Sequence, residues 1–175
     1  MTPGLDHHRR RLSLQAVCCA ALCMLACPTW AQTAPTGKVV LTIKGNVAKP
    51  NAGPDAQFDI HMLQGLRQVS HSVDTPWYSR KVTFSGPLMR DVLAAAGATG
   101  QNIKAVAIND YAVNIPFSDA TRYEVILALQ MNGKAMSPRD KGPIFVVYPY
   151  GQFSAAEVKL YHDRSVWQLD TLEVK

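Results

Sequence analysis

The sequence contains no cysteine after Cys27, although it holds four cysteines in 175 residues. All four lie between residues 18 and 27, in a short apolar stretch that follows three arginines. Beyond that stretch the chain cannot form a disulfide framework, a zinc–thiolate site or an iron–sulfur cluster, and it has no thiol nucleophile. Enzymes that depend on such groups and small domains stabilised by disulfides are therefore excluded.

A strong charge of one sign is also lacking. Residues 32–175 hold 15 lysines and arginines and 12 aspartates and glutamates, spread along the chain. A net charge of about +3 that is spread along the chain does not predict the basic surface that binds a nucleic acid, so we expect no nucleic-acid partner. A segment of this length is expected to fold as one domain with a substantial core.

No apolar run reaches the roughly 20 residues that a membrane-spanning helix needs. The longest, Leu14–Ala26, follows the basic segment His7–Arg11 and precedes the small-x-small site Thr29–Ala31. This order is typical of an export signal. We therefore predict a signal peptide over residues 1–31 and a soluble periplasmic protein after its removal. The arginines suit either a general or a twin-arginine signal, and both routes stay open.

After this leader, the pattern predicts a flexible tail over residues 32–37 and one domain over residues 38–175. Alternating or continuous apolar runs predict strands at 39–47, 67–75, 103–108, 112–115, 125–129, 144–148 and 165–174. Asp59 is expected to cap a short helix that ends near Leu66. A clearer helix is predicted over Pro87–Ala96, with Pro87 near its first position and Gly97 as its stop. Asn132–Gly133 is typical of a tight hairpin turn. These elements indicate a β-rich α+β domain.

Recognisable catalytic motifs are absent from the sequence. The histidines at 61, 71 and 162 lack metal-ligand spacing, and there is no nucleophile elbow, no glycine-rich phosphate loop and no carboxylate pair. We therefore assign no catalytic residue and no metal ligand.

Aromatic and polar residues do gather in the predicted loops. Rings beside hydrogen-bonding groups suit a planar heterocycle, which can stack on them while a carboxylate such as Asp110 accepts its N–H groups. The alternative is that Trp77 and Trp167 anchor the core and that the charged residues are solvated. The candidate ligand-binding residues are Trp77, Asp110, Tyr111, Arg139, Lys141, Ser165 and Trp167.

Five segments, in order, carry a resemblance to a known family. They are F-S-G-P-L at 84–88, N-D-Y at 109–111 with the strand after it, L-A with N-G-K-A-M at 127–136, the G-P to P strand at 142–149, and S-V-W-Q-L at 165–169. From about residue 84 to residue 175 the chain resembles the oxidoreductase molybdopterin-binding domain. The resemblance implies the sulfite-oxidase fold.

The chain departs from that family at three positions. The segment that holds the metal-binding cysteine of the enzymes corresponds to residues 73–77, which contain no cysteine. The strand arginine and the lysine that hold the cofactor's phosphate correspond to Phe145 and Trp167. These changes disfavour molybdenum and the phosphorylated cofactor, whereas an uncharged, unphosphorylated pterin remains acceptable.

The chain looks closer still to small periplasmic members without the cysteine, which share R-D-K-G-P at 139–143 and S-V-W-Q-L at 165–169. That resemblance implies a non-catalytic pterin-binding protein that signals to the periplasmic sensor domain of a membrane-bound diguanylate cyclase or phosphodiesterase. Two alternatives stay open. One is a molybdopterin-dependent oxidoreductase, or its accessory subunit, with a non-thiolate metal site. The other is a structural adaptor that has lost its ligand.

Overall fold

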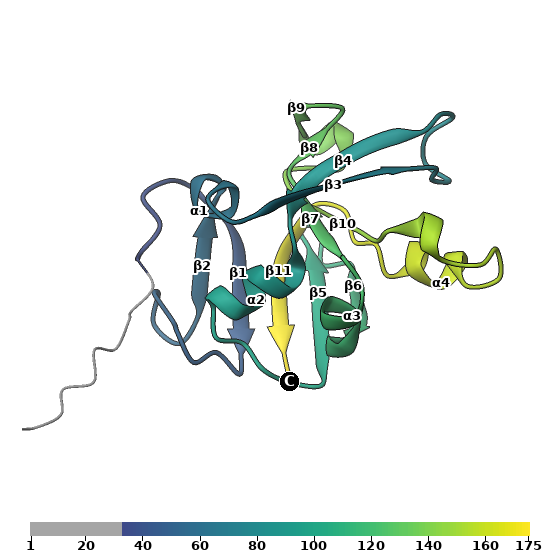
Figure 1. The fold of residues 1–175 in the computed structure, drawn as a ribbon. Coiled ribbons are helices and arrows are strands. Elements are labelled where there is room, and N and C mark those ends of the chain that lie inside the picture. The colour runs from purple at the N-terminus through teal and green to yellow at the C-terminus, as the bar shows by residue number, and fades with distance from the viewer. Residues whose placement is uncertain (1–32) are drawn as a thin grey trace, which may run out of the picture.

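The computed structural model describes residues 33–175 (Figure 1). The predicted signal peptide, residues 1–31, lies outside the described residues. Within residues 33–175, no helix is long and apolar enough to cross a bilayer. The end of the predicted tail is tied to the domain, because the backbone N–H groups of Thr36 and Gly37 donate to the Asp59 carboxylate at 3.0 and 2.8 Å.

Short elements make up the described chain. The strands are β1 (Val39–Gly45), β2 (Ala56–Asp59), β3 (Gln68–Val73), β4 (Val82–Pro87), β5 (Asn102–Ala107), β6 (Ala112–Pro116), β7 (Ile126–Ala128), β8 (Gln130–Met131), β9 (Lys134–Ala135), β10 (Phe145–Val147) and β11 (Leu169–Val174). The α-helices are α1 (Ile60–Gln64), α2 (Met89–Ala95), α3 (Phe117–Arg122) and α4 (Val158–Asp163), and single 3₁₀ turns cover Pro138–Asp140 and Tyr150–Gln152.

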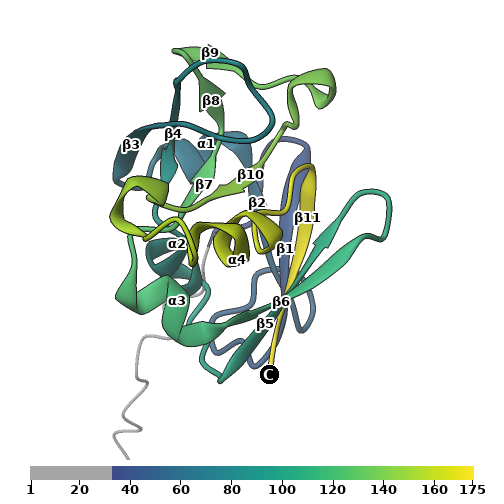
Figure 2. The ribbon, with the colours of Figure 1, turned by 90° about the vertical axis from the view of Figure 1, so that its right-hand side faces the viewer.

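Three sheets organise these strands (Figures 1 and 2). The largest has the order β2-β1-β11-β5-β6, with β1 and β11 parallel and the other neighbours antiparallel. A second has the order β3-β4-β8-β9, and β10 pairs with β7 in the third. The strands β7 and β10 are buried along their whole length, so their continuous apolar sequences have no solvent-facing side.

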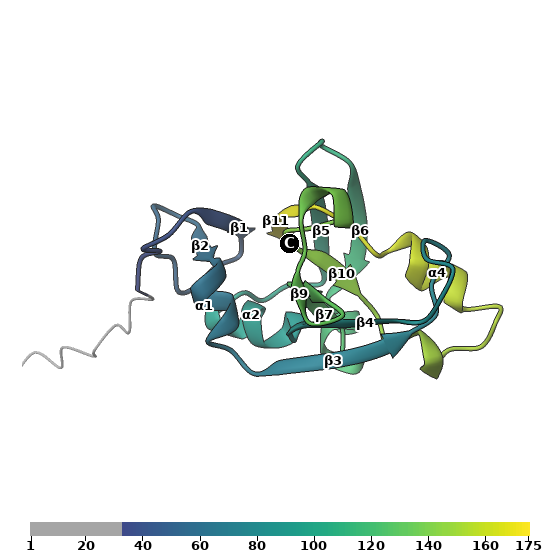
Figure 3. The same cartoon turned by 90° about the horizontal axis from the view of Figure 1, so that it is seen from above.

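The hairpin of β3 and β4 extends away from the large sheet until its tip lies beside α4 (Figures 1 and 3). Its two strands pair in register from Gln68 with Pro87 to Val73 with Val82. The turn between β5 and β6 approaches the same region, because its residues share a pocket with residues of α4. Loops that are distant in sequence therefore meet on one side of the molecule.

The fold class predicted from the sequence, a β-rich α+β domain, is confirmed. The capping role of Asp59 is confirmed as well, since its carboxylate accepts a hydrogen bond from the Met62 N–H at 2.9 Å. The left-handed backbone of Gly97, with φ +62°, ends the second helix as expected. The Asn132–Gly133 hairpin turn also forms as predicted, with positive φ at both residues.

Two sequence predictions need correction, and four short elements were not predicted. Pro87 is not a helical residue but the last residue of β4, and the helix begins at Met89. At the end of a strand, the missing N–H of proline does not interrupt the hydrogen bonds between the strands. The final strand begins at Leu169 rather than residue 165, because Gln168 has φ +51° and breaks the extended run. The strands β2 and β4 and the helices α3 and α4 have periodic patterns too short to identify from the sequence.

Gly86 allows two strands to approach closely, because a Cβ at this position would overlap the Leu127 carbonyl oxygen. We expect Gly86→Ala to lower the free energy of unfolding by about 2 kcal/mol, since neither backbone can move without disturbing its sheet. Gly151→Ala is the matched control, because nothing lies within 4 Å of its added methyl group. Urea unfolding of both variants measures the difference, and equal midpoints would contradict the close approach.

Candidate functional site

A pocket of about 360 Å³ opens where the tip of the β3–β4 hairpin, the β5–β6 turn and α4 meet. Aromatic and polar side chains share its wall. The lining residues are Pro76, Trp77, Asn109, Tyr111, His162, Asp163, Ser165 and Trp167. We refer to it as the aromatic pocket.

Trp77 lines this pocket and is the centre of an aromatic cluster. Its ring meets four other rings edge-on, with centroid distances of 5.4 Å to Phe145, 6.4 Å to Tyr150, 5.3 Å to His162 and 5.9 Å to Trp167. Edge-to-face contacts of this kind are the arrangement that ring quadrupoles favour. The half-buried Trp77 ring is therefore fixed in orientation before any ligand arrives.

Trp167 carries a cation on its ring. The Lys141 ammonium lies 4.7 Å from the Trp167 ring centroid and 5.0 Å from that of Tyr78. The backbone fixes this contact, because the Gln168 N–H donates to the Lys141 carbonyl oxygen at 2.9 Å. Trp167 keeps 37% of its surface exposed, so it is part of the pocket wall rather than a core anchor. A ring with a cation held against it is a suitable platform for a polar heterocycle.

Ser165 is tied to two neighbours beneath the pocket. Its Oγ donates to the Tyr161 carbonyl oxygen at 2.6 Å and lies 2.6 Å from the Tyr150 hydroxyl. Burial raises the pKa of Tyr150, so its hydroxyl stays protonated and available as a hydrogen-bond donor. These bonds fix the backbone turn that leads from α4 to Trp167.

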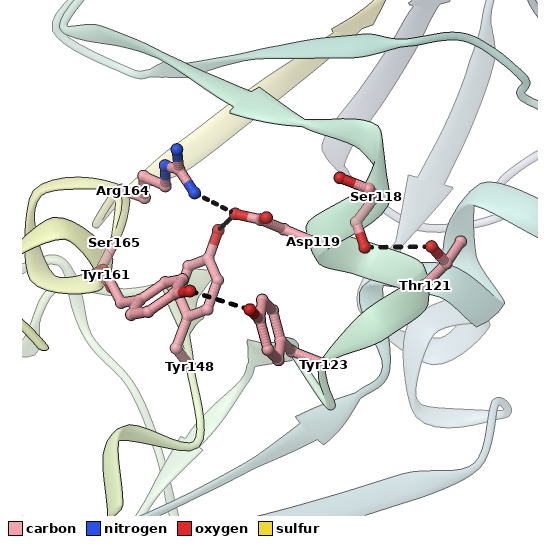
Figure 4. Close-up of polar contacts among 8 residues, drawn as sticks. All are labelled: Ser118, Asp119, Thr121, Tyr123, Tyr148, Tyr161, Arg164 and Ser165. Atoms are coloured by element: carbon pink, nitrogen blue, oxygen red, sulfur yellow. Dashed lines mark hydrogen bonds and ion pairs between the residues drawn. The ribbon is translucent and has the colours of Figure 1, made fainter. Parts of the chain in front are cut away.

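A largely buried ion pair joins the end of α4 to α3 (Figure 4). The Arg164 Nη1 donates to the Asp119 Oδ2 at 2.7 Å, and the Tyr148 hydroxyl donates to the same oxygen at 3.0 Å. Burial and the neighbouring Asp119 carboxylate raise the pKa of Tyr148, which keeps this donor protonated. The pair therefore fixes the end of α4, next to Ser165.

Five of the seven residues that the sequence nominated meet at this site. Trp77, Tyr111, Ser165 and Trp167 line the aromatic pocket, and Lys141 packs on Trp167. The other two are placed outside its lining. Asp110 is exposed at the tip of the β5–β6 turn with φ +65°, and Arg139 is exposed in the first 3₁₀ turn.

Sequence reasoning missed His162, Asn109 and Asp163 as pocket residues. His162 lies on α4, whose six residues give too short a pattern to predict. Its ring is 4.6 Å from that of Tyr150 and packs against Trp77, while its Nε2 is buried and has no hydrogen-bond partner among residues 33–175. Burial lowers the pKa of His162, so the imidazole is neutral at pH 7.

This shift predicts a pH-dependent stability. Because the pKa of His162 is below its ordinary value of 6.5, the unfolded chain binds a proton more readily than the folded one. The contribution of His162 to the free energy of unfolding is therefore complete above about pH 7. It decreases as the pH falls below 6.5, because the unfolded chain then takes up a proton that the folded protein does not. Urea midpoints of the wild type and His162→Phe, compared from pH 5 to pH 8, test this. A constant difference between the two proteins would contradict it.

The three positions at which the sequence departs from the resembling enzymes lie together in space. Trp77, in the segment 73–77, packs on Phe145, and Phe145 forms an isolated β-bridge with Trp167. The segment 73–77, Phe145 and Trp167 therefore lie at one place in the fold.

Comparison with known proteins gives one family. A family model described as the oxidoreductase molybdopterin binding domain matches residues 40–167. A search of curated proteins finds no match. The matched range contains every residue of the aromatic pocket.

Proposed function

We propose that this chain, which belongs to the oxidoreductase molybdopterin-binding domain family, binds an unphosphorylated pterin in the aromatic pocket and catalyses no reaction. Its β-rich α+β domain is consistent with the sulfite-oxidase fold of that family. Members of the family typically bind a molybdopterin cofactor. The question for this chain is which part of that cofactor its residues still suit.

The residues present do not fit the metal end of the cofactor. Molybdenum in the resembling enzymes takes a soft thiolate, and residues 73–77 offer only the oxygens of Asp74 and Thr75. Across residues 33–175, there is no group of three histidine, cysteine, aspartate or glutamate side chains that could hold a metal ion. Phe145, at the position of a phosphate-binding arginine, is fully buried and apolar.

The same residues do suit a planar ring. The observation that carries the proposal is the aromatic pocket itself, in which the rings of Trp77, Tyr111 and Trp167 surround a space of about 360 Å³. Asn109 adds an amide group to the wall, which can both donate to and accept from the N–H and carbonyl edge of a pterin. The Ser165 hydroxyl donates its proton to the Tyr161 carbonyl oxygen, so it can add only an acceptor. Stacking supplies affinity and these polar groups supply orientation.

We propose the periplasm as the location and a membrane-bound cyclic-di-GMP enzyme as the partner, with its periplasmic sensor domain as the contact. The export-type leader and the motifs at 139–143 and 165–169 support this role by resemblance. Ile108 and Tyr111, which are 58% and 53% exposed, provide an apolar surface at the rim of the aromatic pocket. A partner that contacts this rim can sense whether the pocket is filled.

A fluorescence titration of pterin against the purified protein tests the ligand. We expect saturable binding below tens of micromolar, because a ring that stacks on fixed aromatic walls loses little of its affinity to reorganisation. The absence of binding by a folded protein would contradict the proposal. One molybdenum per chain in protein from its native host would instead favour the oxidoreductase alternative.

A second experiment tests the partner. The purified periplasmic domain of a membrane-bound cyclic-di-GMP enzyme from the same host is titrated with the protein, with and without pterin. We expect pterin to change the affinity between the two. Tight binding that pterin does not affect would favour the structural adaptor, and the absence of binding would contradict the proposed partner.

A further inference from the structure

The strand β3 is an open edge of the sheet β3-β4-β8-β9. Among residues 33–175 it pairs with β4 alone, and it lies along one margin of the molecule in Figure 3. Its sequence, Q-V-S-H-S-V, holds no charged residue and no proline, and its pairing with β4 has no bulge. Natural proteins usually protect an edge with such features, because an open edge can pair with another chain.

The other edge strands of the two larger sheets are less suited to such pairing. β2 has four residues and β9 has two, and β6 ends at Pro116. The six residues of β3 are long enough for a stable ladder and carry nothing that blocks one. β3 is therefore the edge at which we expect a partner strand.

The hydrogen bonds of β4 show which groups of β3 are free. The Asn132 N–H, just after β8, donates to the Thr83 carbonyl oxygen at 2.7 Å, so Thr83 directs its backbone groups toward β8. Backbone groups alternate in direction along a strand, so the next residue, Phe84, faces β3, where it pairs with His71. His71 therefore points toward β4, and the residues on either side of it direct their N–H and C=O groups away from the sheet.

The sequence around His71 is self-complementary. Residues 69–73 are V-S-H-S-V, which is identical in both directions. If a second copy pairs antiparallel with His71 opposite His71, the outward groups of Ser70 exchange hydrogen bonds with those of Ser72 in the second copy. Val69 of each copy then lies opposite Val73 of the other, on the same face of the joined sheet.

Other registers are less favourable. A shift of one residue would set the outward groups of one copy against residues that point back to β4. A shift of two would set His71 opposite Val69 and lose the contacts between valines. In the central register, exposed Arg67 and exposed Asp74 flank the strand, so each end brings an arginine of one copy next to an aspartate of the other. The symmetry and the charges favour a second copy over a segment of another protein.

We propose that β3 is an interface at which two copies of this chain pair antiparallel about His71 and form one continuous sheet. This inference does not rest on the proposed function. The contact is the same patch on both copies, as a two-fold dimer requires. Because the paired strands run in opposite directions, the two hairpin tips, and with them the two aromatic pockets, lie at opposite ends of the paired strands.

Sedimentation velocity of the complete chain tests the dimer. We expect a reversible dimer at about 100 μM, because pairing along one strand edge buries less surface than a permanent dimer does. Two double variants, Ser70→Lys with Ser72→Lys and Ser70→Glu with Ser72→Glu, each set like charges opposite one another across the interface. Each should weaken dimerisation by about tenfold or more, and an equimolar mixture of the two should restore it.

Ser70→Lys with Ser72→Glu is the matched control, because it changes the same two residues but sets opposite charges against each other. Both serines are exposed, so these exchanges leave the core unchanged. Wild-type protein that stays monomeric at this concentration would overturn the proposal, and that result is expected if the edge takes a segment of another protein. Equal dimerisation of all the variants would place the contact elsewhere and overturn it as well.

A disulfide experiment tests the register. Residues opposite each other in a non-hydrogen-bonded pair are close enough for a disulfide, so mild oxidation should link two copies of His71→Cys. Ser72→Cys should link far less, because residue 72 lies opposite residue 70 of the second copy. The wild type, whose cysteines all lie between residues 18 and 27, gives the background. Linkage of Ser72→Cys in place of His71→Cys would contradict pairing about His71.

Discussion

Trp77→Ala is expected to weaken pterin binding by about 100-fold in the fluorescence titration. Stacking of a heterocyclic base on an aromatic side chain contributes roughly 1–3 kcal/mol, and about 1.4 kcal/mol is a factor of ten in affinity. The Trp77 ring also packs edge-to-face against those of Trp167 and His162, at centroid distances of 5.9 and 5.3 Å. Removing it therefore takes away one wall and releases two others.

Phe153→Ala is the matched control for this experiment. Phe153 stacks on Tyr161 at a centroid distance of 3.7 Å and does not line the aromatic pocket. Its loss removes a comparable aromatic contact, so it reports the effect of destabilisation alone. Trp77→Phe, which keeps a ring against Phe145, should fall between the alanine variant and the wild type. Unchanged binding by Trp77→Ala would show that the ligand does not occupy the aromatic pocket.

Arg164→Met is expected to lower the free energy of unfolding by about 3 kcal/mol. The Asp119 carboxylate is almost fully buried, and Arg164 is its only ion-pair partner among the described residues. Removing one member of a buried pair leaves the other charge uncompensated, which costs more than the pair itself contributes. The Tyr148 hydroxyl would remain as a neutral donor and would compensate only in part.

Lys159→Met, on the same helix, provides the comparison. Lys159 pairs with Asp163 at 2.8 Å, but both side chains are largely exposed, so solvent screens the pair and its loss should cost far less than the loss of Arg164. Urea unfolding followed by tryptophan fluorescence measures both variants. Asp119→Asn in the Arg164→Met background should recover part of the loss, because it removes the buried charge. Similar losses for Arg164→Met and Lys159→Met would contradict the cost assigned to the uncompensated Asp119 charge.

Sequence reasoning worked where a local signal decides the structure. The Asp59 cap, the Asn132–Gly133 turn and the buried strand at residues 144–148 each depend on a few adjacent residues. The short elements α3 and α4 depend instead on distant partners such as the Asp119–Arg164 pair. Helices of six residues are marginal without tertiary contacts, so their sequences carry little signal of their own.

The site shows the same division. Aromatic residues in loops were identifiable as candidates, and Trp77, Tyr111 and Trp167 do meet. The sequence could not predict the backbone conformation of the β5–β6 turn. Asp110 has a φ of +65° there, and its side chain is exposed outside the pocket lining. His162 was not predicted, because its role comes from the packing of α4 against the hairpin tip rather than from any motif.

The placement of β11 has a consequence for the order in which the chain folds. This strand occupies the middle of the five-stranded sheet, where Thr42 pairs with Thr171 and Val106 lies on the opposite side. The five-stranded sheet therefore cannot close until β11, the last of its strands in the sequence, is available. Pairing between such distant segments is slow to form. Until then, β1 and β5 each have an unpaired edge. Such edges can pair with strands of other chains, so the incompletely folded protein is prone to aggregation.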